Sequence, residues 1–575
     1  MQIQRFLPFL RWFPMTGGTV RADLIAGITV ALVLIPQSMA YAQLAGLPAY
    51  FGLYAAFLPV LVAALWGSSS QLGTGPVAVV SLLTATAVAQ FAEIGSPEFI
   101  GLAIMLAFLV GVFQLLLGIF RLGVIVNFLS HPVIVGFTNA AALIIAFSQL
   151  SKIFGVSMQR SENFVMDVWG VVMQVGQTHI PTLLFGIVAF AIMFFLKQRY
   201  PKMPGVLIAV AVTILVSWLI NFQEMGGKIV GEIPEGLPSF AVPTFNMEIF
   251  VEMMISAMVI SLIGFMEAIS IAKAMAAKTK ERIDPNQELI GQGLANIAGS
   301  MSQSYPASGS FSRSAVNLNA GAITGMSSVY TAVIVMITLL FLTPLLYHLP
   351  KAVLAAVIMM AVFGLINFKA IKHSWHISKH DGIAAIVTFV ATLGFAPHLE
   401  KGILLGAGLA IGFYLYRTMK PRVAILGRYE DGTLRDVQVH KNLPTSDTIV
   451  AIRFDGSLYF ANVSYFEDTI LGAVSHKPDA KYVLVVGDGI NQLDASGEEA
   501  LHQLNDRLRD NGVTLVFSGL KRQILAVFRH SDLMKSVGEE NIHATEGMAL
   551  DYIYKKMADD PEIDVNYRLL KSDEK

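Results

Sequence analysis

The sequence has no cysteine, and it has few charged residues for its length. Without cysteine there is no disulfide, no thiolate metal site and no cysteine nucleophile, so several classes of enzyme are excluded. Only 14% of the 575 residues are charged, whereas 54% are hydrophobic and the mean hydropathy is +0.61. Soluble domains do not have this balance. The composition therefore indicates a polytopic membrane protein.

Long apolar runs fill the chain as far as Met419. A hydrocarbon core of roughly 30 Å needs about 20 residues of helix to cross it. Long runs and three shorter, more polar segments together predict fourteen membrane segments. The long runs are 24–45, 50–66, 99–120, 131–150, 180–196, 204–221, 253–276, 320–343, 349–367, 382–397 and 400–418, and the short segments are 75–91, 286–300 and 308–318.

The basic residues between these segments are divided unequally between two faces. An even number of segments puts both ends of the chain on one face, and most basic residues of the membrane region fall on that face. By the positive-inside rule this face is cytoplasmic. The outer face receives Lys152, Arg160, Lys228, Lys351 and Lys401.

Two features recur at a similar spacing. The stretch from Pro36 to Tyr41, which we expect to break the first segment, contains Gln37. Gln37 and Glu267 are separated by nearly the same length of chain as Gly75 and Gly309, which lie in short segments. The matching separations indicate two repeats of seven segments, which must have opposite topology because seven is odd. Such repeats are typical of secondary transporters, which hold substrate at the ends of discontinuous helices.

The short segments around Gly75 and Gly309 are expected to begin helices. Glycine permits close backbone approach, and Pro76 suits the first turn of a helix. A helix start offers unpaired N–H groups and a partial positive charge, and Arg313 adds a planar guanidinium suited to oxyanions. These features predict a site for a small anion, although a channel pore can use arginine in the same way. The alternative for Arg313 is a surface loop or contact with lipid headgroups.

Glu267 lies deep inside an apolar segment, which makes it a functional candidate. An apolar setting favours the protonated form of a carboxyl group and a nearby arginine favours the charged form. We therefore expect Glu267 to exchange a proton as the site opens and closes, with a fixed ion pair to Arg313 as the alternative. Gln37 and Tyr41 share a helix face, either to hydrogen-bond a ligand or to pack a broken helix.

Five motifs along the membrane region resemble those of one family. They are Asp23-Leu24-Ile25-Ala26-Gly27, Pro36-Gln37-Ser38-Met39-Ala40-Tyr41-Ala42, Gly75-Pro76, Glu267, and Ser310-Phe311-Ser312-Arg313-Ser314. Together they resemble the sulfate permease family, the bacterial relatives of the solute carrier 26 anion transporters.

The resemblance implies a polytopic α-helical fold with fourteen segments in a 7+7 inverted repeat. Segments 1–4 and 8–11 would form a core domain that moves like an elevator past a gate domain of segments 5–7 and 12–14, and members usually dimerise. Proton coupling is placed at Glu267. Ile271, one turn later, differs from the polar residues of sodium-coupled bicarbonate members, and Val77 is smaller than the aromatic residue of some animal members. The implied substrate-binding residues are Gln37, Tyr41, Gly75, Val77, Ala78, Ser310, Ser312 and Arg313.

From Lys420 onward, short apolar runs alternate with amphipathic segments. This pattern predicts an α/β sheet domain and resembles the STAS domain that such transporters contain. Ser496 stands where relatives of that module have a phosphorylatable serine, but Ser496 and Glu499 also fit a capping box, which we expect. No Walker or Rossmann glycine pattern supports a nucleotide-driven pump. Strands are expected at 448–453, 458–460, 482–486 and 513–517, and helices at 463–474, 496–511 and 521–528.

We therefore expect a proton-coupled secondary transporter of sulfate, not an enzyme, that dimerises in a bacterial inner membrane with both termini in the cytoplasm. The alternatives are a bicarbonate or C4-dicarboxylate transporter, with or without sodium coupling, an uncoupled exchanger or channel, and a receptor that signals through the tail. The expected partners are an anion, a proton, the lipid bilayer and a cytoplasmic protein at the STAS domain, without cofactor, metal or nucleic acid. The expected parts are an interfacial segment at 1–20, a transporter domain at 21–419, a linker at 420–445, a STAS domain at 446–558 and a tail at 559–575.

Overall fold

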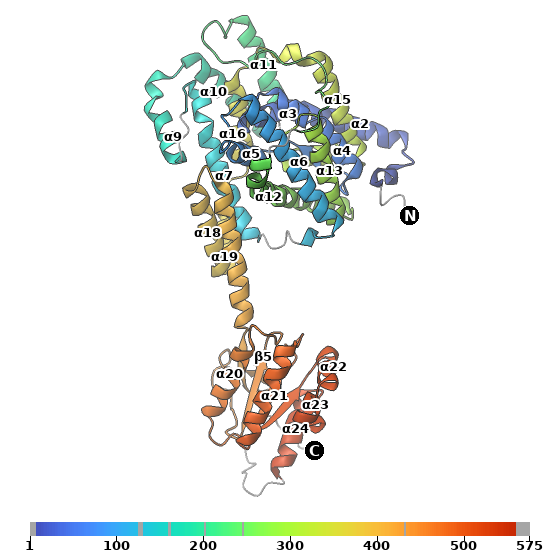
Figure 1. Cartoon of the computed structure of the whole chain (residues 1–575), viewed down its shortest axis with the longest axis vertical. Coiled ribbons are helices and arrows are strands. Elements are labelled where there is room, and N and C mark those ends of the chain that lie inside the picture. The colour runs from blue at the N-terminus through green and yellow to red at the C-terminus, as the bar shows by residue number, and fades with distance from the viewer. Residues whose placement is uncertain are drawn as a thin grey trace. The chain divides into compact units, whose positions relative to one another are not determined.

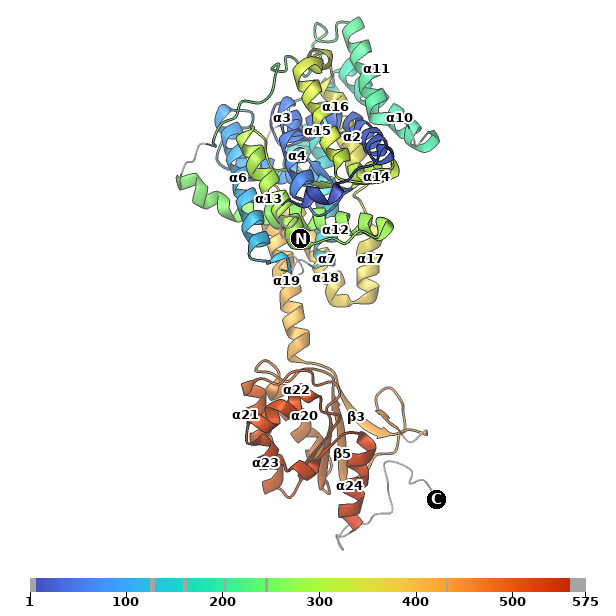
Figure 2. The same ribbon diagram turned by 90° about the vertical axis from the view of Figure 1, so that its right-hand side faces the viewer.

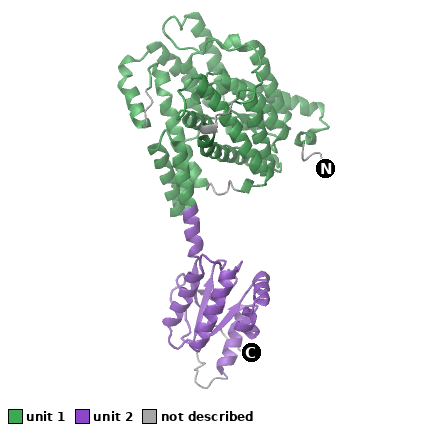
Figure 3. Cartoon of the chain, in the orientation of Figure 1, with its two compact units in different colours: residues 1–410 green, residues 411–575 purple. Residues whose placement is uncertain are grey.

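The computed structural model (Figures 1 and 2) describes residues 7–124, 130–158, 163–200, 203–243, 247–430 and 433–558. The chain divides into two compact units, residues 1–410 and 411–575 (Figure 3). The expected tail at 559–575, the first six residues of the N-terminal segment and Arg160 lie outside the described residues.

Unit 1 consists of membrane helices that occur twice in the same order. The first series is α2 (Gly17–Leu44), a segment divided into α3 (Tyr50–Ala55) and α4 (Leu58–Trp66), the short α5 (Ala78–Val88), α6 (Pro97–Ile119), α7 (His131–Ser148), α10 (Ile180–Arg199) and α11 (Gly205–Leu219). The second series is α12 (Met247–Thr279), α13 (Pro285–Met301), the short α14 (Phe311–Asn319), α15 (Met326–Ile337), α16 (Lys351–Phe363), α18 (Lys379–Gly394) and α19 (Leu399–Met419), whose residues from 411 onward are assigned to unit 2. The order agrees with the predicted fourteen segments in two repeats.

Among the described residues, eight helices are long and apolar enough to cross a membrane by length and composition alone. The other segments are short or divided, as the sequence predicted for the segments near Gly75 and Gly309. Shorter elements connect the series: η1 (Pro8–Trp12), α8 (Leu150–Phe154), α9 (Phe164–Met173), η3 (Val175–Gln177), the π-helical turn η4 (Thr338–Leu342), η5 (Thr343–Leu346) and α17 (Phe368–Ile377).

The two series interleave in space. α13 packs along α6 and α4, and α15 packs along α2, so that first-half and second-half helices lie side by side in both views (Figures 1 and 2). A second set of contacts joins α18 to α7 and α16 to α10. These two sets contain the segments that the family resemblance assigns to a core and a gate, and that division stays a prediction.

Asp23, from the first family motif, joins α2 to the start of α15. Its side chain is fully buried. One carboxylate oxygen accepts hydrogen bonds from the backbone N–H groups of Ile323 at 2.7 Å and Thr324 at 3.1 Å. The other accepts from the Thr324 hydroxyl at 2.6 Å. One carboxylate thus fixes a segment from the other half of unit 1.

The expected break at Pro36 does not occur, and this prediction was wrong. α2 continues through Pro36 to Leu44, because a membrane helix can accommodate a proline where neighbouring groups satisfy the freed carbonyl. Gln37 and Tyr41 therefore lie one turn apart on an intact helix. α3 approaches this region closely, since a Cβ at Gly52 would lie 2.0 Å from the Ser38 carbonyl oxygen.

The described part of the N-terminal segment contains η1, a short 3-10 helix that packs against α4 within unit 1. Trp12 is buried, and a Cβ at Gly325 would lie 2.3 Å from its ring. Arg11 lies 3.7 Å from the carboxylate of Glu281 and donates a hydrogen bond to the Ser68 carbonyl.

Unit 2 is a six-stranded sheet with helices on both faces. The strand order is β4 (Leu434–Asp436), β3 (Val423–Arg428), β5 (Ile449–Phe454), β6 (Tyr482–Val486), β7 (Thr514–Ser518) and β8 (Ile542–His543), and β5 to β8 are parallel. Alternate residues of β5 enter two hydrophobic clusters, as the two-residue period of a strand requires. One cluster includes α20 (Val463–Ser475), α21 (Ala495–Asp510), α22 (Arg522–His530) and α23 (Leu533–Val537), and the other includes α24 (Glu546–Ala558).

Three expectations for this unit were wrong. Residues 420–445, expected to be a linker, contribute β3 and β4 to the sheet. Residues 458–460 form no strand, because Leu458 makes only an isolated bridge to Leu493. Asp494 caps α21 in place of Ser496, with its carboxylate accepting from the Gly497 N–H at 2.8 Å. Ser496 is exposed in the first turn, and its regulatory role stays a prediction.

Candidate functional site

Two three-residue strands meet in the interior of unit 1. β1 (Gly73–Gly75) and β2 (Ser308–Ser310) pair antiparallel, with Thr74 opposite Gly309. Each strand leads into a short helix, β1 into α5 and β2 into α14, so the predicted helix starts are present. The pairing brings the two starts together although they belong to different repeats. Sequence reasoning missed the pairing, since so short a strand has no detectable periodicity.

A glycine of β2 and two amide side chains of α13 make this pairing possible. A Cβ at Gly309 would lie 2.9 Å from the Cα of Ala268, so only glycine fits there. Asn296 accepts a hydrogen bond from the Ala307 N–H at 2.8 Å and donates to the Ala307 carbonyl at 3.1 Å. Gln292 donates to the Thr74 hydroxyl at 2.9 Å. Both strands are thus held from behind by α13.

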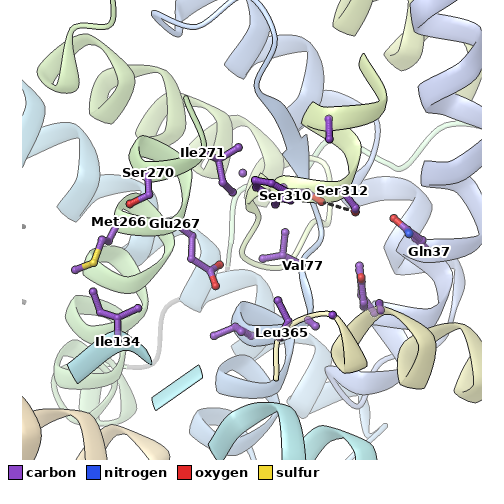
Figure 4. Close-up of a pocket in the computed structure, with 18 of the residues that line it drawn as sticks. Gln37, Val77, Ile134, Met266, Glu267, Ser270, Ile271, Ser310, Ser312 and Leu365 are labelled. Atoms are coloured by element: carbon purple, nitrogen blue, oxygen red, sulfur yellow. Dashed lines mark hydrogen bonds between the residues drawn. The ribbon is translucent and has the colours of Figure 1, made fainter. Parts of the chain in front are cut away.

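A cavity of about 910 Å³ lies in front of the two helix starts. Gln37 and Tyr41 of α2, Val77 and Ala78 at the start of α5, Glu267 of α12, and Ser310 and Ser312 at the start of α14 line it. Figure 4 shows Glu267 and Gln37 approaching from different sides, with Val77 between them in the view. Most of the residues predicted for substrate binding and proton coupling therefore share one cavity.

The starts of α5 and α14 are not capped by their own sequence. Neither Val77 nor Ser310, the residues that precede the helices, makes a side-chain capping hydrogen bond. The Ser310 hydroxyl instead lies 3.3 Å from the Ser312 hydroxyl. Uncapped N–H groups at two helix starts give the cavity wall a partial positive charge. This arrangement suits a small anion.

Two polar side chains of the cavity have unused hydrogen-bonding capacity within the described part of the chain. The Gln37 side chain is 6% exposed and its Oε1 has no hydrogen-bond partner. Glu267 lines the cavity, and no ion pair joins it to another described residue. The alternative of a fixed Glu267–Arg313 ion pair is therefore wrong. The carboxylate is open to the cavity instead of being locked.

Arg313 and Gly75, both predicted to contact substrate, are not among the residues that line the cavity. Arg313 is fully buried, and its Nη1 donates to the Pro76 carbonyl at 2.9 Å. A Cβ at Gly75 would lie 3.3 Å from the Arg313 Nη2. The guanidinium therefore lies behind the β1 wall, because α14 turns the side chain away from the cavity towards the strand. Its Nε and Nη2 have no partner among the described residues.

Sequence reasoning missed two lysines of the lining. Lys197 and Lys273 line the same cavity and belong to the face predicted to be cytoplasmic. Their common assignment to that face was the available signal. The two ammonium groups add positive charge to the lining.

Comparison with family models gives two matches. Residues 20–388 match the sulfate permease family, and residues 440–549 match the STAS domain. The chain is 34% identical to "Probable sulfate transporter 4.2" of Arabidopsis thaliana over 556 residues, which cover 93% of this chain and 81% of that protein. It is 32% identical to "Sodium-independent sulfate anion transporter" of Bos taurus over 566 residues, covering 92% and 89% of the two chains.

Solved structures show the same fold. The structure of SLC26A9 superposes with a TM-score of 0.90 at 24% identity, covering 97% of this chain and 94% of that chain. The transmembrane domain of the cyanobacterial bicarbonate transporter BicA gives a TM-score of 0.61 at 23% identity, covering 69% and 99%. The predicted fold, a polytopic helical membrane domain followed by a STAS domain, is therefore confirmed.

Proposed function

Because the chain belongs to the sulfate permease family, whose members are transporters and not enzymes, we propose that it is a proton-coupled secondary importer of a small oxyanion, with sulfate as first choice. The observation on which the proposal rests is the pair of uncapped helix starts that β1 and β2 bring together in one cavity. Anion transport follows from the family, and the substrate and its coupling are the proposal.

The positive potential at the two helix starts favours an anion over a neutral ligand. The starts of α5 and α14 supply N–H donors, and Arg313 supplies a full charge from behind β1. Gln37 adds an amide with an unpartnered oxygen. Sulfate is favoured because the Arabidopsis and bovine relatives are both named as sulfate transporters. Bicarbonate and C4-dicarboxylates are the alternative substrates.

Glu267 is the proposed proton carrier. It faces the cavity from α12 without an ion pair to another described residue to hold it charged. Importing a dianion against an inside-negative potential costs about 2.3 kcal/mol per charge per 100 mV, and a symported proton offsets one charge. Ile271, one turn further along α12, offers no oxygen ligand for sodium, which favours the proton.

Movement of the core past the gate is the proposed route between the two faces. The packing of α2 to α6 with α12 to α15, and of α7 and α10 with α16 and α18, supports two bodies within unit 1. A bacterial inner membrane, cytoplasmic termini, a homodimer and a cytoplasmic protein partner at the STAS domain complete the proposal, supported by the family resemblance and the charge distribution.

Uptake by the full chain in proteoliposomes tests the substrate and the coupling. An inward proton gradient should drive accumulation of labelled sulfate, and unlabelled bicarbonate and dicarboxylates should compete less well than sulfate. Accumulation that needs sodium, or flux that ignores the proton gradient, would refute proton coupling. Binding without any flux would favour the receptor alternative.

Glu267→Gln tests the proton carrier. The variant keeps the size of the side chain and its capacity for hydrogen bonding but cannot change its charge. We expect gradient-driven accumulation to be lost while sulfate–sulfate exchange continues. Full retention of the pH dependence of uptake would remove Glu267 from the coupling role.

A further inference from the structure

A second cavity, of about 520 Å³, lies along the same two helices as the first. Tyr41 of α2 lines the first cavity and Gln43 lines the second; Val357 of α16 lines the first and Lys351 lines the second. At 1.5 Å per residue, these pairs are about 3 Å and about 9 Å apart along their helix axes. The two cavities therefore lie next to each other along α2 and α16.

Three lysines line this second cavity: Lys152, Lys228 and Lys351. They are three of the five basic residues that the charge distribution assigns to the outer face. The Lys351 N–H donates to the Lys228 carbonyl at 2.9 Å, and Ile229 forms a bridge with Pro350. This backbone pairing holds Lys228 and Lys351 beside one another, and no ion pair joins either of them to another described residue.

Two like charges side by side repel each other, and an anion between or near them relieves this repulsion. Glu232 is the acidic residue of the described lining, and one carboxylate does not balance even Lys228 and Lys351 together. The ring nitrogens of His179 are already engaged with the Thr182 hydroxyl at 2.7 Å and the Met225 carbonyl at 2.9 Å. The cavity therefore has an excess of positive charge.

Neutral donors are also available there. Both amide atoms of the Gln43 side chain are buried without a hydrogen-bond partner in the described part of the chain, and the residue lines the cavity. α16 begins at Lys351 without a side-chain cap, which adds a partial positive charge at the same place. The Lys152 ammonium donates to the backbone carbonyl of Gln43 at 3.3 Å, which places this lysine beside the same residue.

We propose that this cavity is an external capture site, which holds the anion at the outer face before the transport site becomes accessible from that side. The inference rests on the proposed function, because it takes sulfate as the captured anion. Clustered charge beside a transport path raises the local concentration of the opposite charge and the rate of association. Capture at Lys228 and Lys351 thus lowers the external concentration needed for uptake without taking part in release at the cytoplasmic face.

The absence of cysteine in the chain allows a direct test with charged thiol reagents. In Lys228→Cys/Lys351→Cys, uptake of external sulfate should show a KM raised about tenfold with little change in maximal rate. A membrane-impermeant methanethiosulfonate bearing an ammonium group should restore the KM, and one bearing a sulfonate group should raise it further. Lys401→Cys, on the same face but outside the cavity lining, is the matched control and should respond to neither reagent.

The outcomes separate the two proposals. If the wild-type protein transports no sulfate, the proposed function fails. If the wild-type protein transports sulfate but the lysine variant keeps its KM, or if both reagents change the KM in the same direction, the capture site is refuted and the function stands. A KM effect that disappears in vesicles without anionic lipid would assign the lysines to lipid headgroups and would also overturn the proposal.

Discussion

Arg313 is the residue whose environment differs most from what its sequence context suggested. The side chain is fully buried with one hydrogen bond, to the Pro76 carbonyl, while Nε and Nη2 lack partners in the described part of the chain. A buried charge without compensation is costly. Since Glu267 does not pair with it, an anion on the other side of β1 is the compensating charge that fits the proposed function.

Arg313→Met tests this role because it removes the charge while keeping an unbranched side chain of similar length. We expect sulfate affinity, measured by calorimetry on the purified protein, to fall at least tenfold, which corresponds to about 1.4 kcal/mol. Arg313→Lys should retain part of the affinity, since it keeps a point charge but loses the planar fork. Equal affinity of the Met variant and the wild-type protein, with the same thermal stability, would show that Arg313 has only a packing role.

At the scale of elements, the sequence predicts the membrane helices well because each depends on local composition. The starts of α5 and α14 were predicted from Gly75, Pro76 and Gly309, which are local signals for a helix start. The pairing of β1 with β2 was not predicted. It joins two short segments that belong to different repeats and lie far apart in the sequence. The orientation of Arg313 also could not be predicted, since a side-chain direction within a short helix depends on its packing neighbours.

The same reasoning applies to unit 2. β5, β6 and β7 were predicted because their apolar runs are continuous and lie between amphipathic helices. β3 and β4 were missed because basic residues at Arg422 and Arg428 gave the segment the composition of a linker. The cap of α21 was misassigned because Asp494 and Ser496 both favour capping, and sequence alone does not decide which one precedes the helix.

The junction of α2 and α15 allows an element-scale prediction. Asp23→Ala removes the acceptor of three hydrogen bonds and leaves the N–H groups of Ile323 and Thr324 without their partner. We expect destabilisation of about 1–3 kcal/mol, seen as a lower thermal unfolding midpoint of the detergent-solubilised protein. Asp23→Asn, which keeps one acceptor oxygen, should lose less. A midpoint unchanged in Asp23→Ala would show that water replaces the carboxylate.

At the scale of the whole molecule, each unit has its own titratable groups. Two groups of unit 2 change its stability in opposite directions as the pH falls. Burial raises the pKa of Glu546 at the start of α24, and the nearby Asp488 carboxylate raises it further, against the effect of Arg453. Burial lowers the pKa of His543 in β8. A folded state that binds a proton more tightly than the unfolded chain gains stability on acidification, and one that binds it less tightly loses stability.

The direction in which each group changes the stability of unit 2 follows from the shift of its pKa away from the ordinary value. Between 4.5 and the raised value of Glu546, the folded state holds the proton and unit 2 becomes more stable as the pH falls. Between 6.5 and the lowered value of His543, the unfolded chain takes up the proton and unit 2 becomes less stable as the pH falls. The two effects oppose each other in the wild-type protein.

Glu546→Gln should therefore expose the effect of His543 alone. We expect the variant to lack the stabilisation that the wild-type protein gains as the pH falls from the raised pKa of Glu546 towards 4.5, measured by hydrogen–deuterium exchange of the α24 amides in the full chain. His543→Gln should show the reverse slope. Because the proposed proton carrier, Glu267, lies in unit 1, the pH dependence of sulfate uptake should be the same in Glu546→Gln as in the wild-type protein. A shifted uptake profile would mean that protonation of the STAS domain controls transport, and the coupling could then no longer be assigned to Glu267 alone.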